Sequence, residues 1–502
     1  MGFLKTGFSI ILVLSFVQIM AQPTPMLKLV DLDIDSVYTS ENLNVCIYKN
    51  DQFYLFGTNR VYDTSSLSFI DHELLVVMDN QGNISEYYMF DSTNVRCIGL
   101  EMTFINDSIV LMGSLRATTN NKWVDLKLFN VTSGTIVQQW DFSINGYDKT
   151  GIMDLHYLED STFYLTGWMQ NNGQFSDAYC AKMKLNQQIV WEYKTNRGPL
   201  LDNLNDLSIS KNNEIILTGY TGNNTNGDWD IYILAIDDTG KLIWDTVYGG
   251  EKIDVGNFII PFRNSMFIGG SREILNDTNT FSKHFEGTLA EIDLTGNQIW
   301  TNDFTYRNND DNIRQYFSVG ILTSDSNILV AGILNDSNYN DRRGIWIVLF
   351  DPLNKSKLWE RYYKITQVEN DDYVTDITQT GDHFILTGYS IEGIDAQDGW
   401  ILVLDSLGCY EPNCDSADVV NEIEIHPDNI LIYPNPSSGR LVIQSHLIYE
   451  FYTLYNLLGQ NIHAGLLTDN FIDLQTIEPG MYILQLTTRD GHELQAEKVV
   501  LY

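Results

Sequence analysis

Seven apolar segments along the chain each run into a glycine. The residues before the glycine are rich in Phe, Ile, Leu and Val, which is typical of a buried β-strand. Successive glycines lie 50 to 63 residues apart, a spacing typical of a repeated supersecondary unit. The segments are FYLFG at Gly57, IVLMG at Gly113, FYLTG at Gly167, IILTG at Gly219, MFIGG at Gly269, ILVAG at Gly332 and FILTG at Gly388.

Further apolar segments accompany each glycine segment. A weaker one, such as VTDITQT, precedes it, and a second one, such as IYILAIDDTG, follows it after a polar loop. A third segment carries an aromatic residue, as in LIWDTVY. Four short strands per repeat, with turn residues between them and no helical period, predict the blades of a β-propeller. The third segments also place tryptophans in register, which predicts packing between adjacent blades: Trp140, Trp191, Trp244, Trp300 and Trp359.

The seventh repeat lacks the aromatic segment and ends in CYEPNC. We expect MLKLVDLDIDS (residues 26–36) to supply the missing strand, because this pairing closes the ring and removes an exposed sheet edge. The sequence therefore predicts an all-β fold. It is a seven-bladed β-propeller of four-stranded blades over residues 22–416, closed by its N-terminal strand.

The pattern changes after a predicted linker over residues 417–427. In residues 428–502, short apolar segments alternate with YPNPSSG, LLGQ, EPG and RDG turns. This alternation predicts a small antiparallel, Ig-like β-sandwich, which is long enough to bury one core.

The same C-terminal blocks resemble the type A C-terminal sorting domain of the type IX secretion system of Bacteroidota. The resemblance implies that the secretion machinery recognises this domain and carries the protein across the outer membrane. The alternative is an accessory sandwich that binds carbohydrate, because fold alone does not determine function. The residues that carry the resemblance are Tyr433, Pro434, Asn435, Pro436, Gly439, Gly459 and Gly480.

The N-terminus has the pattern of a secretory signal peptide over residues 1–21. Lys5 precedes a short apolar run, and a small residue, Ala21, precedes the polar Gln22. We expect cleavage between these two residues and no transmembrane segment in the mature chain. The predicted location is extracellular or on the outer cell surface, reached through the periplasm.

Charge and cysteine content agree with an extracellular location. The chain has 66 acidic and 30 basic residues, a net charge of −36, which disfavours nucleic acid and anionic lipid as partners. Cys409 and Cys414 bracket a short loop and are a candidate disulfide in an oxidising compartment, with two free thiols as the alternative. No Cys or His spacing indicates zinc.

The connections between the second and third strands, and between blades, are long and emerge on one face, which we call the long-loop face. Such loops on a rigid scaffold commonly carry binding sites. Asp228, Asp230, Asp310 and Asp311 in these loops are calcium candidates, and capping of turns is the alternative interpretation. We expect no other cofactor.

No catalytic motif is present among HExxH, GxSxG, GxxxxGK[ST] and GxGxxG. AIDDTGKLIW resembles the tryptophan-docking repeat of quinoprotein dehydrogenases, which implies blade packing rather than redox chemistry. The first hypothesis is a non-catalytic module that binds an extracellular glycan or protein through the long-loop face. The alternatives are a propeller enzyme acting on extracellular polysaccharide and a structural surface adhesin.

Overall fold

The structure is a computed structural model of the 502-residue chain. The chain divides into two compact units, Met1–Ile423 and Glu424–Tyr502, which we describe separately. The described residues are 23–30, 39–63, 68–90, 95–195, 197, 201–222, 228–250, 252–274, 284–305, 315–336, 342–366, 370–392, 396–411, 431–433, 437, 439–444, 449–456, 460–467, 471–474, 476–488 and 494–501.

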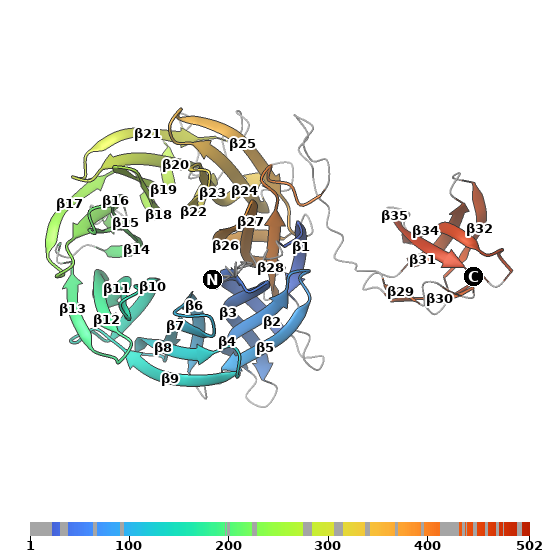
Figure 1. Cartoon of the computed structure of the whole chain (residues 1–502), viewed down its shortest axis with the longest axis horizontal. Helices are drawn as coiled ribbons and strands as arrows, with labels where there is room; N and C mark the ends of the chain where they lie inside the picture. The colour runs from blue at the N-terminus through green and yellow to red at the C-terminus, as the bar shows by residue number, and fades with distance from the viewer. Residues whose placement is uncertain are drawn as a thin grey trace, which may run out of the picture. The chain divides into compact units, whose positions relative to one another are not determined.

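Every regular element among these residues is a β-strand, so the all-β prediction is confirmed. In the first unit, antiparallel sheets follow one another around a common centre as a propeller (Figure 1). Within each repeat, strands that follow one another in the chain are neighbours in the sheet, and the strand that precedes the glycine segment lies nearest the centre. We number the repeats by their glycine segments.

The first four repeats each contribute four strands. A single parallel bridge between Lys149 and Lys122 joins the sheets of repeats 2 and 3. The strands are β2 (Thr39–Lys49), β3 (Gln52–Asp63), β4 (Ser68–Asp79) and β5 (Ile84–Phe90) in repeat 1; β6 (Arg96–Phe104), β7 (Ile109–Ala117), β8 (Lys122–Asn130) and β9 (Thr135–Phe142) in repeat 2; β10 (Lys149–Tyr157), β11 (Thr162–Gln170), β12 (Asp177–Lys184) and β13 (Ile189–Lys194) in repeat 3; and β14 (Asp202–Ile209), β15 (Ile215–Gly222), β16 (Trp229–Ile236) and β17 (Leu242–Tyr248) in repeat 4.

The later repeats continue the pattern, and the N-terminal strand joins the last sheet. There β1 pairs antiparallel with β28, with Met26 opposite Val403 and Val30 opposite Gly399. The strands are β18 (Asp254–Phe262), β19 (Ser265–Ile274), β20 (His284–Asp293) and β21 (Gln298–Phe304) in repeat 5; β22 (Gln315–Leu322), β23 (Ile328–Asp336), β24 (Arg342–Asp351) and β25 (Ser356–Tyr363) in repeat 6; and β26 (Asp371–Thr380), β27 (His383–Glu392), β28 (Ala396–Leu404) and β1 (Met26–Val30) in repeat 7.

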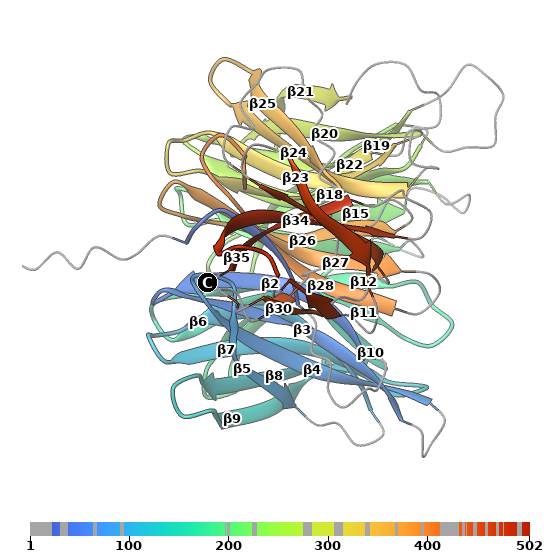
Figure 2. The ribbon, with the colours of Figure 1, turned by 90° about the vertical axis from the view of Figure 1, so that its right-hand side faces the viewer.

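The apolar core of this unit lies between neighbouring sheets. Each buried cluster draws its side chains from two adjacent repeats, as the cluster of repeats 5 and 6 does with Phe267 and Trp346. One cluster joins the last repeat to the first and contains Val30, Leu43 and Ile401. The side view in Figure 2 shows the sheets of the first unit stacked face against face. Because each sheet buries both faces, its middle strands read as nearly continuous apolar segments.

Aromatic side chains on the outermost strands contact the turn of the next repeat. The Trp191 indole N–H donates to the Asp238 carbonyl oxygen at 2.9 Å, and the Trp244 indole N–H donates to the Leu294 carbonyl oxygen at 2.9 Å. Trp244 also covers Gly296, whose φ is +86° and where an added Cβ would lie 2.8 Å from the indole ring. The predicted packing of the tryptophans between repeats is confirmed at these positions.

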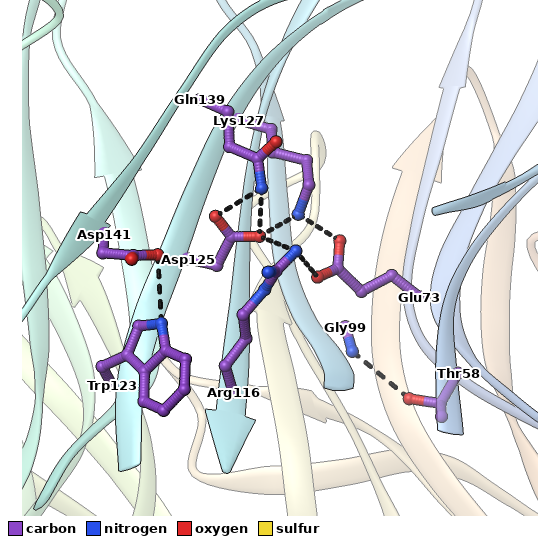
Figure 3. Close-up of polar contacts among 9 residues, drawn as sticks. All are labelled: Thr58, Glu73, Gly99, Arg116, Trp123, Asp125, Lys127, Gln139 and Asp141. Atoms are coloured by element: carbon purple, nitrogen blue, oxygen red, sulfur yellow. Dashed lines mark hydrogen bonds and ion pairs between the residues drawn. The ribbon is translucent and has the colours of Figure 1, made fainter. Parts of the chain in front are cut away.

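A buried ion network also joins repeats 1 and 2 (Figure 3). Lys127 is 1% exposed, and its ammonium group lies 2.5 Å from Glu73 and also contacts Asp125. The Arg116 guanidinium lies 2.8 Å from Asp125 and 3.7 Å from Glu73. Two cations therefore balance two fully buried carboxylates, and Gln139 donates two further hydrogen bonds to Asp125.

The second unit has two sheets that share one core. Leu441 and Ile472 from one sheet and Leu454, Leu484 and Val499 from the other belong to the same buried cluster, the arrangement of a β-sandwich. The sheets are β29 (Leu431–Tyr433), β30 (Arg440–Gln444) and β33 (Phe471–Asp473); and β32 (Asn461–Leu466), β31 (Tyr449–Asn456), β34 (Gly480–Thr488) and β35 (Leu494–Leu501).

Some predicted features lie outside the described residues. The signal peptide with its Ala21–Gln22 cleavage site and the linker over 417–427 are among them. Cys409 is buried and disulfide-bonded, but Cys414 is not described, so the pairing of these two cysteines stays a prediction. The part of the chain that the structure describes contains no helix able to cross a membrane.

Candidate functional site: the axial cavity

The innermost strand of every repeat carries a β-bulge at the same position. In β2, Leu43 pairs with Gly57 and Val45 with Phe56, so Asn44 is the extra residue. A bulge bends the strand and redirects its side chains, and bulges are frequent next to functional sites. The extra residues of the seven repeats are Asn44, Leu100, Met153, Asn205, Asn257, Ser318 and Thr375.

These bulges explain the glycine in five of the seven segments: Gly57, Gly167, Gly219, Gly332 and Gly388. The bend brings a carbonyl of the innermost strand close to the glycine Cα on the second strand. A Cβ on Gly219 would lie 2.0 Å from the Asn203 carbonyl oxygen, and one on Gly388 would lie 1.9 Å from that of Tyr373. Both atoms belong to backbone, so a side chain at these positions would disrupt the bulge.

Polar side chains at the bulges link adjacent repeats. The Asn205 side-chain amide donates to the Gly256 carbonyl oxygen at 2.9 Å, and that of Asn257 donates to the Phe317 carbonyl oxygen at 2.7 Å. The Thr375 hydroxyl donates to the Leu43 carbonyl oxygen at 2.6 Å, which links the last repeat to the first. In each case the acceptor directly precedes the bulge of the next repeat.

A cavity of about 630 Å³ lies along the axis, lined mainly by the innermost strands. This volume is in the range of ligand pockets. Its lining contains four carboxylates, which occupy the position directly after the bulge in repeats 2, 3, 4 and 7: Glu101, Asp154, Asp206 and Asp376.

Three of these carboxylates bridge neighbouring repeats. The Asp154 carboxylate accepts a hydrogen bond from the Leu207 N–H at 3.0 Å, and that of Asp206 accepts one from the Ile259 N–H at 2.6 Å. The Asp376 carboxylate accepts one from the Cys46 N–H at 2.8 Å. These carboxylates thus stabilise the junctions between repeats and also place acidic groups in the cavity.

The pKa values of the four carboxyl groups are all raised, first of all by burial. That of Asp376 is raised to about 6. The pKa of Asp206 is raised well above its usual value by burial and by the charge of Asp154, whose own pKa burial also raises. The pKa of Glu101 is raised well above its usual value by burial and then by the charges of the three aspartates. The carboxyl groups of the cavity therefore bind protons more tightly than free carboxyl groups do.

An aromatic and amide group lines the cavity at the end of the strands that carries the long connections. Asn203 and Tyr316 are the second residues of their strands, and Trp229 is the first residue of β16. The Trp229 ring stacks on that of Tyr220, with centroids 4.9 Å apart and planes 19° apart. Asn203 donates to the Asn205 side-chain oxygen at 2.8 Å. A flat apolar ring beside amides is a surface suited to a ligand with polar edges.

The calcium candidates fall in two groups. Asp310 and Asp311 lie outside the described residues. Asp230 is buried near Asp254, whose pKa is raised to about 7 by burial and by the Asp230 charge, against the lowering effect of Arg272. Among the described residues, no group of three His, Cys, Asp or Glu side chains is placed to hold a metal ion. A calcium role for Asp228 and Asp230 stays a prediction.

The carboxylates of the cavity were not among the predicted site residues. They had a sequence signal, because Asp154, Asp206 and Asp376 stand 13, 13 and 12 residues before their repeat glycine, each followed by Leu or Ile. Acidic residues are so frequent in this chain that the recurrence was not separable from the background.

The sorting-motif residues that are described form turns in the second unit. The buried Ser437 hydroxyl accepts hydrogen bonds from the Gly439 N–H at 3.1 Å and the Arg440 N–H at 3.0 Å, and Gly439 has a φ of +101°. The Tyr482 hydroxyl donates to the Glu478 carbonyl oxygen at 2.8 Å, which fixes the turn before β34 at Gly480. Tyr433 ends β29, whereas Pro434, Asn435, Pro436 and Gly459 lie outside the described residues.

Solved structures of other propellers resemble this chain at low identity. The β-propeller domain of the Trilobed protease from Pyrococcus furiosus is 10% identical, with a TM-score of 0.40 over 74% of this chain and 99% of that chain. The WD40 domain of Neurospora crassa Pan2 is 12% identical, with a TM-score of 0.42 over 76% and 98%. PorZ, a surface component of the type-IX secretion system of Porphyromonas gingivalis, is 9% identical, with a TM-score of 0.31 over 90% and 74%. Similarity at this level carries no information about activity.

A comparison with curated proteins finds no match. The comparison with protein families finds one for the second unit, where residues 431–501 match the secretion system C-terminal sorting domain. This match confirms the resemblance of the YPNP, LYNLLGQ and EPGMYIL blocks, and it implies export by the type IX secretion system and interaction with its machinery. Residues 431–501 of this chain are a type IX secretion system C-terminal sorting domain, attached to a β-propeller.

Proposed function

We propose that the protein is a seven-bladed propeller, closed by β1, that is exported to the cell surface or the extracellular space and there binds a glycan without catalysis. The ligand enters from the long-loop face and contacts the wall of the axial cavity. The signal peptide carries the chain to the periplasm, and the sorting domain then directs it outward.

The stacked pair Tyr220–Trp229 at the cavity wall carries this proposal. Sugar rings pack their C–H faces on indole and phenol rings, and amides beside those rings bind the hydroxyl groups. Trp229 and Asn203 lie on the same repeat and both line the cavity. A flexible glycan chain can approach between the long connections, because these emerge at the same end of the strands.

A glycan array followed by titration calorimetry tests the proposal. We expect Trp229→Ala to weaken binding of the glycan found on the array by at least about tenfold, or about 1.4 kcal/mol. The matched control is Trp123→Ala. Trp123 stands near the start of β8, as Trp229 does in β16, but it does not line the cavity. Equal affinity of both variants would place the glycan elsewhere.

A second candidate function is hydrolysis of an extracellular polysaccharide. The carboxyl groups of Asp154 and Asp206 hydrogen-bond to each other, and carboxyl pairs of raised pKa act as acid and base in glycosidases. Both groups also accept backbone hydrogen bonds that join repeats, which favours a structural role. Release of reducing ends from the bound glycan, lost in Asp154→Asn, would favour hydrolysis over binding alone.

The export route has its own test. Deletion of residues 428–502 should leave the protein in the periplasm, since the sorting domain is removed and the predicted signal peptide is kept. Fractionation of cells with immunoblotting measures this. Export of the shortened chain at the level of the full chain would contradict the proposed route.

A further inference from the structure

The wall of the axial cavity carries four acidic side chains and, among the described residues, no basic one. Glu101, Asp154, Asp206 and Asp376 face it, and none of the described residues that line it is a lysine, arginine or histidine. By contrast, the two buried carboxylates of the network in Figure 3 are balanced by Lys127 and Arg116. The cavity is thus built to attract a cation, within a chain whose net charge is −36.

The hydrogen bonds of the four carboxylates differ. Asp154, Asp206 and Asp376 each accept backbone N–H donors, as described above. No hydrogen bond of the Glu101 carboxylate is found among the described residues. The bulge residue directly before Glu101, Leu100, is apolar and also lines the cavity. Of the four, Glu101 is therefore the carboxylate with the most capacity to accept a hydrogen bond from a ligand.

A separate observation on another part of the wall also indicates a ligand. Asn203 lines the cavity and is 6% exposed, and its side-chain oxygen Oδ1 has no hydrogen-bond partner among the described residues. Its amide nitrogen already donates a hydrogen bond to the Asn205 side-chain oxygen. A buried acceptor without a donor costs about 1–3 kcal/mol, so a donor supplied by a ligand would be favourable at this atom.

The cation that fits is larger than a metal ion. Among the described residues, no group of three His, Cys, Asp or Glu side chains is placed to hold a metal ion, which favours an organic cation. The carboxylates of the cavity come from repeats 2, 3, 4 and 7, and the stacked Tyr220–Trp229 rings line the same cavity. Aromatic faces also attract organic cations.

We propose that the axial cavity recognises the ammonium group of an amino sugar, with Glu101 as the principal counter-charge and Asn203 accepting a hydrogen bond from the ligand. This inference rests on the proposed glycan-binding role and names the chemical class of the ligand. A carboxylate accepts N–H donors of an ammonium group in charge-assisted hydrogen bonds, which are about twice as strong as neutral ones.

Proton release provides a signature of this binding mode. Burial raises the pKa values of these carboxyl groups, and a bound ammonium group lowers them. Binding should therefore release protons to the buffer. Titration calorimetry in two buffers of different ionisation enthalpy measures this release on the unmodified protein, independently of any variant.

The experiment compares two glycans that differ at one group. Glucosamine oligomers carry ammonium groups, and N-acetylglucosamine oligomers of the same length do not. We expect the full-length protein to bind the first at least tenfold more tightly, with proton release. Glu101→Gln should lower the ratio of the two affinities at least tenfold. The control is Glu159→Gln, at an exposed residue between β10 and β11, which should leave this ratio unchanged. Spermidine, an amine without a sugar ring, should bind more weakly than the glucosamine oligomer.

Each outcome decides one point. Equal binding of both oligomers would overturn the ammonium inference and leave the glycan-binding role intact. Preference for the glucosamine oligomer that survives Glu101→Gln would overturn the assignment to this cavity, provided that the circular dichroism spectrum of the variant is native. Binding of spermidine as tight as that of the oligomer would overturn the amino-sugar class, since the ring would then contribute nothing. Absence of binding to every glycan, charged or neutral, would refute the proposed function itself.

Discussion

Replacement of Lys127 by methionine tests how the buried network in Figure 3 stabilises the junction of repeats 1 and 2. Methionine keeps most of the volume of the lysine side chain and removes its charge. Glu73 and Asp125 are both fully buried, so the variant leaves two buried carboxylates facing one cation of the network, Arg116. One negative charge is then uncompensated in a medium of low dielectric constant.

The size of the effect follows from the geometry. Removing one partner of a buried ion pair costs about 3–5 kcal/mol. Arg116 lies 2.8 Å from Asp125 but 3.7 Å from Glu73, so it retains the first carboxylate and leaves the second poorly paired. We expect Lys127→Met to lower the free energy of unfolding by about 3 kcal/mol at pH 7. The double variant with Glu73→Gln should recover about 2 kcal/mol, because it removes the unpaired charge.

The loss should also depend on pH in a known direction. Burial raises the pKa of Glu73, and Lys127 lowers it, so the variant raises this pKa further. A carboxyl whose folded pKa lies above its unfolded value favours the folded state at low pH and loses that contribution as pH rises through the folded pKa. The deficit of the variant should therefore shrink as pH falls from 7 towards 5.

Urea denaturation of the full-length protein at both pH values measures these effects. The control is Lys49→Met, which breaks the exposed pair with Asp107 at 3.1 Å and should cost less than about 1 kcal/mol. If Lys127→Met costs no more than the control at pH 7, or if its deficit grows towards pH 5, the reasoning from buried charge is refuted.

Three further substitutions test other features. Gly219→Ala places a Cβ 2.0 Å from the Asn203 carbonyl oxygen and should cost at least about 2 kcal/mol in urea denaturation, whereas Gly250→Ala, which meets no atom within 4 Å, should be neutral. Gly296→Ala should cost about 1 kcal/mol more than Gly146→Ala, because both have a positive φ but only the former meets Trp244; equal losses would contradict the docking role of this tryptophan. The Asp376 pKa of about 6 means that this group favours folding at pH 4 and loses the effect as pH rises through 6. Asp376→Asn should flatten the dependence of the denaturation midpoint on pH between 4 and 6, and an unchanged slope would show that another group titrates there.

Much of the fold was predictable because the same pattern of apolar segments recurs seven times in the sequence. Gly219 and Gly388 marked equivalent strands even though one copy alone would be ambiguous between strand and buried helix. The tryptophan docking was also predictable, since Trp191 and Trp244 recur at one position of the repeat. The reason for the glycine was not, because a β-bulge depends on the pairing register of two strands, and the sequence does not state that register.

The axial site was beyond prediction for a related reason. Asp206 and Glu101 lie more than one hundred residues apart in the sequence, and their common cavity exists only because the innermost strands meet around an axis. An aspartate after a bulge and an aspartate in a turn look alike in a chain with 66 acidic residues. Trp229 stands where a long connection ends, beside the predicted Asp228 and Asp230, and it lines the cavity.

The pairing of β1 with β28 also constrains the order of events during synthesis. Met26 lies opposite Val403, so the last sheet gains its outer strand only after nearly four hundred residues have left the ribosome. Contacts between residues this far apart in the sequence form slowly. The entropy of closing a long loop is lost before any of these contacts stabilises the fold. Until then the N-terminal strand has no partner and the last sheet has an open edge. The pairing of β1 with β28 can therefore form only after the last repeat has been synthesised, so it is the latest of the strand pairings in the first unit.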